Sequence, residues 1–361
     1  MAVPLFDPAT PRAALREELA AALTRVLDDG RYVLGPEVDA FEAELARWLG
    51  VRHVAGVANG TEAITIALRA LGVGPGDEVV VPSFTFYASA EAIPPTGATP
   101  VFCDVDPRTF VATPDAVRAV LTPRTKAVVL VHLFGNVAPV AEVQALGVPV
   151  VEDAAQAIGS RAGDALTGAL GTIATFSFYP SKNLGGLGDG GAVATGDARL
   201  DERVRTLRFH GSPDKETFTD VGYNSRLDEL QAAALRVQLP HVHAWCDARR
   251  AAARMYGDAG LGELCALPVP AAGADPAWNL YVVRRERPEQ LAAALRDAGI
   301  GARTYYSVPA HRQPALAAYG REAVLPGTDE AARTHLALPM SAALARAQVD
   351  EVVAAVRAAV R

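Results

Sequence analysis

Short valine-rich runs alternate with helical stretches between residues 53 and 151, and this alternation is the strongest constraint on the fold. Strands are expected at 53–57, 78–81, 99–103, 127–131 and 148–151, with helices at 61–71, 84–93, 113–120 and 138–145. Two further strands are expected at 174–178 and 191–195. Short apolar strands that alternate with helices form mostly parallel sheets with both faces covered. The sequence therefore predicts an α/β fold with a mostly parallel central sheet flanked by helices.

Outside this pattern, the chain begins with helices and ends in a second, smaller domain. Helices are expected at 11–29 and from Pro36 onward, before the alternation, and at 226–257, with an interruption near Pro240, after it. A proline-rich connector then leads to a strand at 280–284, a helix at 288–298, a strand at 302–306 and a helix at 345–359. We therefore divide the chain into a large α/β domain, residues 1–245, and a small C-terminal α+β domain, residues 246–361.

The composition argues against several classes of protein. Half of the 361 residues are hydrophobic and the net charge is −7, with no basic run, so a nucleic-acid partner is not expected. No uncharged apolar segment reaches the length of a membrane span. Three widely spaced cysteines, Cys103, Cys246 and Cys265, make neither a metal-binding pattern nor a disulfide framework. We expect a cytoplasmic protein without a bound metal.

Lysine is rare in this chain, with only Lys126, Lys182 and Lys215 against abundant arginine. A lysine amine can lose its proton and form a Schiff base with a carbonyl compound, which arginine cannot do. Lys182 lies in an aromatic, hydroxyl-bearing segment that ends in glycines, FSFYPSKNLGG at 176–186. This setting suits an amine held against a flat, phosphorylated cofactor. The alternative is a solvated loop lysine, which describes Lys126 and Lys215 well.

Two hydroxyl-bearing segments at predicted strand ends are candidates for binding a phosphate. Asn59, Gly60 and Thr61 lie between a strand and a helix, where free backbone N–H groups suit an anion. Ser177 ends another predicted strand. The alternatives are an ordinary helix N-cap for the first segment and a backbone-satisfied serine for the second. In doubly wound sheets, ligands bind at this edge.

Two acidic residues follow the buried strand at 148–151. Asp153 and Gln156 are three residues apart, so they share a face if a helical turn begins there. An aspartate can keep a pyridine nitrogen protonated, which makes the ring an electron sink, and a nearby glutamine can bond to a ring hydroxyl. The alternatives for Glu152 and Asp153 are an acidic N-cap or a Mg²⁺-binding pair.

Aromatic residues also follow a strand end, in PSFTFY at 82–87. Such residues can stack on a cofactor ring, although a core position is the default expectation for Phe84. The run at 186–191 matches GxGxxG, a dinucleotide-binding pattern, but a strand is expected after it where that pattern requires a helix. We therefore interpret the run as a closely packed glycine turn and disfavour binding of NAD.

Together these segments resemble the DegT/StrS family of sugar aminotransferases, which are fold-type I enzymes that use pyridoxal 5′-phosphate (PLP). The resemblance runs from Gly35 to Arg284 and beyond. The motifs that carry it are, in chain order, NGTEA at 59–63, PSFTF at 82–86, EDAAQ at 152–156, SFYPSKNL at 177–184 and GYNSRLDELQAA at 222–233.

The resemblance implies a role for each motif residue. Lys182 would form the Schiff base with the cofactor, and Asp153 would pair with its pyridine nitrogen. The remaining contacts would be Gln156 with the ring oxygen, Phe86 stacked on the ring, and Gly60, Thr61 and Ser177 with the phosphate.

The resemblance also implies a homodimer with active sites shared across the interface. Asn224 would reach the phosphate of the neighbouring subunit, although it also suits an ordinary helix N-cap. Substrate residues are carried over as Tyr305, Tyr306 and His311, while positive charge for an anionic substrate is expected from Arg226, Arg303 or Arg312.

The expected reaction moves an amino group, with glutamate as donor, to a keto-deoxysugar nucleotide. The expected acceptors are dTDP-4-keto- and dTDP-3-keto-6-deoxyhexoses. A lysine at position 182 favours transamination, because some similar chains carry histidine there and act as dehydratases. The alternatives are an aminotransferase for a cyclitol or an aminoshikimate-type ketone, and a non-catalytic PLP-binding regulator. A further alternative, an NAD-dependent sugar oxidoreductase, is supported only by the glycine run at 186–191.

Overall fold

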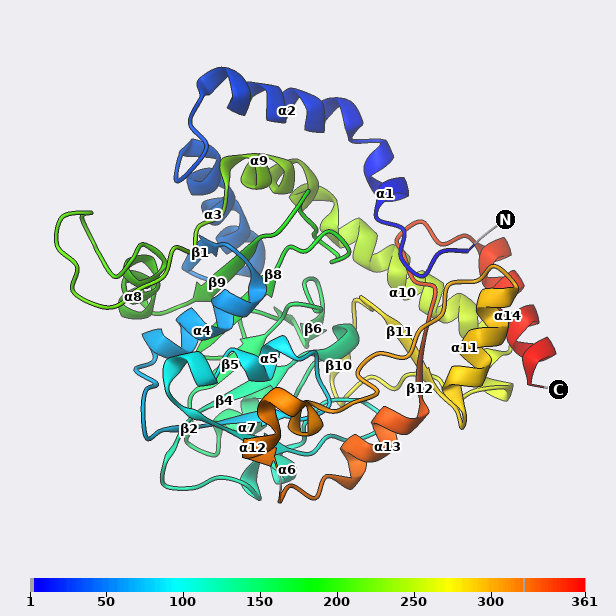
Figure 1. Ribbon diagram of the computed structural model, residues 1–361. Helices are drawn as coiled ribbons and strands as arrows, with labels where there is room; N and C mark the ends of the chain where they lie inside the picture. The colour runs from blue at the N-terminus through cyan, green and yellow to red at the C-terminus, as the bar shows by residue number, and fades with distance from the viewer. Residues whose placement is uncertain (1–2, 321, 361) are drawn as a thin grey trace.

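A computed structural model describes residues 3–320 and 322–360 (Figure 1). Its centre is a seven-stranded sheet in the order β1-β9-β8-β5-β4-β2-β3. The strands are β1 (His53–Val57), β2 (Glu78–Pro82), β3 (Thr99–Cys103), β4 (Thr125–Val131), β5 (Val150–Asp153), β8 (Ile173–Ser177) and β9 (Gly191–Thr195). Within this sheet only β9 runs antiparallel to its neighbours. The predicted α/β fold with a mostly parallel sheet is confirmed.

Helices cover both faces of this sheet (Figure 1). They are α3 (Pro36–Leu49), α4 (Gly60–Ala70), α5 (Ala88–Glu91), α6 (Pro114–Arg118), α7 (Val140–Gln144), α8 (Ala198–Arg208) and α9 (Glu229–Gln238). Helix α2 (Arg16–Asp29), preceded by the short α1 (Ala9–Ala13), packs on the outer side of α9. Val79 and Val81 of β2 pack into the same core as α4, whereas Val80 packs with α6 and α7. Because successive strand residues point to opposite faces, this division explains why the strands are valine-rich throughout.

A smaller unit follows in the C-terminal part of the chain. β11 (Tyr281–Arg284) pairs antiparallel with β12 (His335–Leu338). The helices of this part of the chain are α10 (Val242–Asp258), α11 (Pro288–Asp297), α12 (Ala317–Gly320), α13 (Pro326–Thr334) and α14 (Arg346–Ala359). A small sheet pairs its β10 (Ala274–Asp275) with β6 (Arg161–Ala162), which in turn pairs with β7 (Ala165–Leu166); β6 and β7 precede β8 in the large unit. Helix α10 contributes Cys246 to a core of the large unit and Tyr256 to the core of the small one. The proposed division at 245/246 therefore falls inside a continuous helix.

Several predicted elements differ from those observed. The strand expected at 302–306 was wrong, because only Arg303 forms an isolated bridge, to Ala337, before the chain turns at Tyr306 with φ of 66°. The helix expected at 84–93 is reduced to α5, and α8 was not predicted. Within residues 3–320 and 322–360, no helix is both long and apolar enough to cross a membrane.

The carboxyl end of β5 is held by a buried carboxylate. Glu152 accepts hydrogen bonds from the backbone N–H groups of Gly168 (2.9 Å), Leu170 (2.8 Å) and Gly171 (2.6 Å). The His132 side chain is its fourth partner, at 2.9 Å from Nε2. Since the N–H of Ala138 donates to His132 Nδ1, the ring proton lies on Nε2 and donates to Glu152. Glu152 and His132 are both fully buried, so this network fixes the strand end that carries Asp153.

Glu152→Gln should destabilise the fold, because a side-chain NH₂ would replace an acceptor that serves several donors. We expect a loss of roughly 3 kcal/mol, the cost of breaking charged hydrogen bonds and leaving buried donors unsatisfied. The measurement is the midpoint of urea unfolding. Glu142→Gln, at an exposed position of α7, is the matched control and should change stability by less than about 0.5 kcal/mol. Equal midpoints for the two variants would contradict this role for Glu152.

Candidate active site

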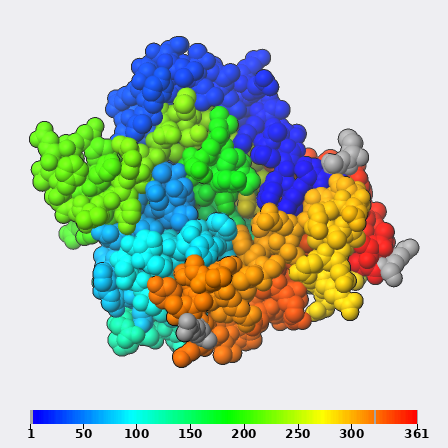
Figure 2. All heavy atoms as spheres, viewed as in Figure 1, coloured from blue at the N-terminus to red at the C-terminus, as the bar shows by residue number. Residues whose placement is uncertain are grey.

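A cleft of about 1190 Å³ opens at the carboxyl ends of the parallel strands. It is lined by residues that follow β1, β2, β5 and β8, by Phe6 near the start of the chain, and by the segment 303–313. In the space-filling view, blue, cyan, green and orange parts of the chain meet around this region (Figure 2). Seven of the eight predicted cofactor residues line this one cleft: Gly60, Thr61, Phe86, Asp153, Gln156, Ser177 and Lys182.

The N-terminus of α4 forms one end of the cleft. Asn59 caps the helix by accepting the N–H of Glu62 at 2.9 Å, which confirms the N-cap alternative for that residue. In the described structure, the N–H groups of Gly60 and Thr61 have no protein acceptor, and both residues line the cleft together with Ser177. A Cβ on Gly60 would come within 2.8 Å of the Ser177 Cβ, so glycine permits this close approach. The arrangement of backbone donors and a hydroxyl suits a phosphate.

The glycine run at 186–191 supports this end of the cleft. It leads directly into β9, so the strand-turn-helix unit of a dinucleotide site is not formed there. A Cβ on Gly191 would lie 2.5 Å from the backbone of Asn59. The glycine therefore allows β9 to pack against the segment that caps α4.

Asp153 lies at the centre of the cleft with its carboxylate oriented by two donors. Ser89 Oγ donates to Oδ2 at 2.6 Å, and the N–H of Ala155 donates to Oδ1 at 3.1 Å. Ser89 is also 2.9 Å from Thr85 Oγ1, and both hydroxyls are buried. Ser89 and Thr85 were not identified from the sequence, because a serine in a short helix carries no local sign of a partner 64 residues away.

Gln156 bridges two residues with unusual backbone conformations. Its Oε1 accepts the N–H of Phe134 at 2.7 Å, and its Nε2 donates to the Tyr306 hydroxyl at 3.1 Å. Phe134 and Tyr306 have φ of 61° and 66°, and their rings are parallel with centroids 6.0 Å apart. Backbone strain of this kind persists where the surroundings hold it in place. Here it places an amide and a phenol together in the cleft.

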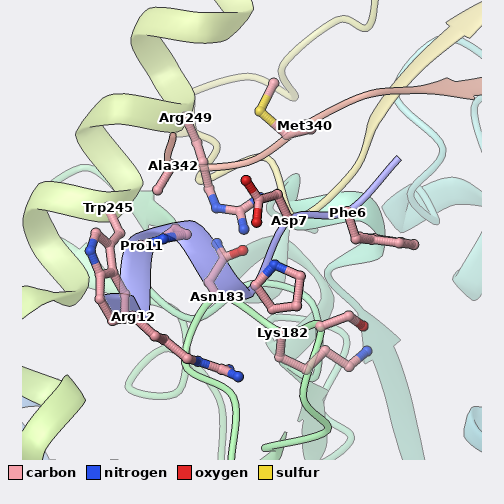
Figure 3. Close-up of a pocket in the computed structure, with 12 residues that line it drawn as sticks. Phe6, Asp7, Pro11, Arg12, Lys182, Asn183, Trp245, Arg249, Met340 and Ala342 are labelled. Carbon is pink, nitrogen blue, oxygen red and sulfur yellow. The ribbon is translucent and has the colours of Figure 1, made fainter. Parts of the chain in front are cut away.

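Lys182 lies in the loop between β8 and β9 and lines the same cleft as Asp153. Figure 3 shows the Lys182 side chain from the side where residues of the N-terminal segment lie. Burial lowers the pKa of the Lys182 ammonium from 10.5 to about 8, and the negative charge of Asp153 opposes this shift. The side chain is half-buried, so the amine remains in reach of the cleft. A lowered pKa favours the neutral amine, the form that attacks a carbonyl carbon.

The two aromatic residues after β2 lie in different surroundings. Phe84 is fully buried in the core, as expected by default. Phe86 lines the cleft with 54% of its surface exposed, and its ring centroid is 5.9 Å from that of Tyr306. An exposed aromatic ring beside a cleft is available to stack on a flat ligand.

Only some of the predicted substrate residues line the cleft. Tyr305 and Tyr306 line the cleft. His311 is buried behind it, where its Nδ1 lies 2.6 Å from Ser83 Oγ. Arg226 lies outside the cleft of this chain, with its guanidinium 5.7 Å from the Phe209 ring. Asn224 is exposed and also lies outside the cleft, so its expected contact with a second subunit stays a prediction.

The fold and the cleft together define a class of enzyme. A mostly parallel seven-stranded sheet with one antiparallel strand carries a lysine of lowered pKa, a buried aspartate and a helix N-terminus at one edge. These are the features of a fold-type I aminotransferase.

Comparison with known proteins identifies the family. Residues 13–357 match the DegT/DnrJ/EryC1/StrS aminotransferase family. A similar relative is dTDP-3-amino-3,4,6-trideoxy-alpha-D-glucose transaminase of Streptomyces venezuelae, 47% identical over 98% of this chain and 95% of the relative. Another is the Pleiotropic regulatory protein of Geobacillus stearothermophilus, 42% identical over 98% and 97%. The chain therefore belongs to the DegT/DnrJ/EryC1/StrS aminotransferase family, which confirms the resemblance.

A solved structure supports the same assignment. The crystal structure of S. venezuelae DesV in complex with a ketimine intermediate superposes with a TM-score of 0.96 and 46% identity, covering 100% of this chain and 99% of that one. The expected fold-type I architecture and the expected aminotransferase class are both confirmed.

The reactivity of Lys182 should follow its lowered pKa. In cofactor-free protein, reductive methylation of Lys182 by formaldehyde and a borane should accelerate as pH rises, with a midpoint at about 8. The reason is that only the neutral amine reacts, and it becomes the major form above the pKa. Mass spectrometry of the peptide that carries Lys182 gives the rate at each pH. A midpoint near the ordinary value of 10.5 would contradict the burial described above.

Proposed function

We propose that this chain is a PLP-dependent aminotransferase that moves an amino group from glutamate to a dTDP-3-keto-deoxyhexose. The main support for this proposal is that Lys182, Asp153 and the N-terminus of α4 line one cleft. The substrate class is supported by the 47% identical relative, which is named for a dTDP-3-amino sugar.

The residues of the cleft fit pyridoxal phosphate. The N–H groups of Gly60 and Thr61 and the Ser177 hydroxyl would hold the phosphate, and Asp153 would hold the pyridine nitrogen. The exposed ring of Phe86 would stack on the cofactor. Gln156 Nε2 has a second hydrogen to donate besides that given to Tyr306, and it would contact the ring oxygen. When bound, PLP supplies an electron sink for the carbon that loses its proton.

Lys182 would bind the cofactor through Nζ and then act as acid and base. Its pKa of about 8 lies close to neutral pH, so the released amine can take up a proton and return it. Asp153 would keep its negative charge beside the pyridine nitrogen, with Ser89 Oγ fixing the orientation of the carboxylate. Ser89 is itself buried and hydrogen-bonded to Thr85, at 2.9 Å between the two hydroxyl oxygens, so the group that orients Asp153 is held in turn.

Arg303 is the residue of this chain best placed to bind the diphosphate of the substrate. It lines the cleft, its guanidinium lies 5.2 Å from the Tyr305 ring, and no ion pair to a described carboxylate is formed. Arg312, by contrast, pairs with Asp329 at 2.7 Å and lies outside the cleft lining. Arg226, Arg303 and Arg312 were the candidates for binding the diphosphate, and Arg303 is the one of the three that lines the cleft within a single chain.

The active unit is proposed to be a homodimer. The segment after α8 extends away from the body of the molecule (Figure 1) and exposes Phe218 and Val221, which are 62% and 80% accessible. Asn224 and Arg226 follow this segment. Exposed apolar side chains next to polar ones suit a contact between subunits, from which Asn224 would reach the partner's phosphate site.

A second candidate is a PLP-binding regulator without catalytic activity, because a 42% identical relative is named as a regulatory protein. The lysine of lowered pKa is the argument against it, since a purely structural cofactor site does not require a poised amine. Absence of any glutamate-dependent spectral change in the PLP-loaded protein would favour this candidate. A cyclitol or aminoshikimate-type acceptor keeps the same cleft and differs only in the ketone accepted.

Lys182→Ala should lower the rate of amino transfer from glutamate to a dTDP-3-keto-deoxyhexose by at least about 100-fold, because it removes both the attacking amine and the acid–base group. The measurement is formation of the amino sugar nucleotide by chromatography with mass detection. Lys126→Ala is the matched control, since Lys126 is exposed at the start of β4. Transfer at the wild-type rate by Lys182→Ala would overturn the proposed function.

Arg303→Gln should raise the KM for the nucleotide sugar roughly 10-fold, the effect of losing one charged hydrogen bond, while kcat changes little. Steady-state kinetics with the nucleotide sugar as the varied substrate provides the test. Arg312→Gln is the matched control and should leave KM unchanged. If the two variants have the same KM, Arg303 does not bind the diphosphate.

A further inference from the structure

The loop that carries Lys182 is held from behind by an arginine of the N-terminal segment. Arg12 Nη2 donates to the carbonyl oxygens of Pro180 and Gly185, both at 2.9 Å. Its Nε donates to Gln238 Oε1 of α9 at 2.8 Å. One guanidinium therefore ties together the two ends of the segment 180–185, with Lys182 between them, and anchors both to a helix.

This contact is a clamp made of hydrogen bonds and is not a salt bridge. Across residues 3–320 and 322–360, Arg12 forms no ion pair. Burial lowers the pKa of Arg12, which is the cost of holding a cation against neutral acceptors. A Cβ on Gly185 would lie 2.5 Å from Arg12 Nη2, so a glycine at that position makes room for the guanidinium.

The segment that carries Arg12 begins on the small C-terminal unit. The N–H of Val3 donates to the Gly299 carbonyl at 3.1 Å, and the N–H of Gly301 donates to the Val3 carbonyl at 2.8 Å. The N–H of Met340 donates to the Leu5 carbonyl at 3.2 Å. Residues 3–12 thus start in contact with the C-terminal unit and end at the lysine loop.

The same segment contacts the cleft midway along its length. Phe6 lines the cleft and packs edge-on against Tyr305, with ring centroids 6.4 Å apart. Figure 3 shows Phe6 and Arg12 on one stretch of chain, with Met340 on one side and Lys182 on the other. We call residues 3–12 the N-terminal strap.

We propose that Arg12 is a positioning residue for Lys182, acting as the end of a strap that connects the small C-terminal unit to the lysine loop. The catalytic consequence rests on the proposed function, whereas the effect on the amine does not. Removing the guanidinium frees three acceptors and loosens both ends of the segment 180–185. The Lys182 amine then gains access to water and loses its fixed direction toward the cleft.

The first test uses the cofactor-free protein and requires no enzymatic activity. In Arg12→Met, the midpoint of the pH dependence of Lys182 reductive methylation should rise by at least about one pH unit, because burial is what lowers the pKa of this amine. Arg16→Gln, an exposed arginine at the start of α2, is the matched control and should keep the wild-type midpoint. A folded Arg12→Met protein with the wild-type midpoint would overturn the proposal.

A second variant separates the shape of the guanidinium from its charge. Arg12→Lys keeps a cation of similar length but cannot bond three acceptors in the fork geometry of arginine. It should therefore show a raised midpoint, and it also serves if Arg12→Met does not fold. Full recovery of the wild-type midpoint by Arg12→Lys would overturn the clamp and leave only an effect of charge.

Steady-state kinetics of the PLP-loaded enzyme gives the catalytic readout. Both Arg12 variants should lower kcat, by up to about 100-fold for Arg12→Met, as expected for a displaced reacting group, with KM for the nucleotide sugar nearly unchanged. A change confined to KM would overturn the positioning role. If wild-type protein transfers no amino group, the proposed function fails, and the methylation midpoints still decide whether Arg12 positions Lys182.

Discussion

The cleft depends on how the end of β5 is held. Successive residues of a strand point to opposite faces, so Glu152 points into the protein and Asp153 into the cleft. Three backbone N–H groups and His132 fix Glu152, while Ser89 and the N–H of Ala155 fix Asp153. A carboxylate at the centre of the site is thereby kept in one orientation by bonds on both sides of the sheet.

The electrostatics of the site follow from this arrangement. Burial disfavours the charged form of Lys182, and the nearby Asp153 limits that effect, so the pKa of the amine settles at about 8. The loop around the lysine is fastened through its backbone by Arg12, which leaves the amine free of hydrogen-bonded partners of its own among the described residues. A poised amine, a fixed carboxylate and a helix N-terminus are the three requirements of the proposed chemistry.

Much of the site could be predicted because one physical rule places distant segments together. The carboxyl ends of parallel strands meet at one edge, so polar residues after β1, β5 and β8 were expected to converge. Ser89 and Arg12 were not predicted, because their roles depend on partners 64 and 168 residues away and leave no local pattern. The strand expected at 302–306 failed because Tyr306 adopts a positive φ to reach Gln156, and this tertiary contact overrides the strand preference of aromatic residues.

In the proposed function, Lys182 is the residue that binds the cofactor covalently. Treating the PLP-loaded protein with borohydride reduces a Schiff base to a stable amine, which mass spectrometry can locate on one peptide. We expect the pyridoxyl group on the peptide that contains Lys182 in wild-type protein, and its absence from that peptide in Lys182→Ala. A pyridoxyl group on Lys126 or Lys215, or on no lysine of a PLP-saturated protein, would contradict it.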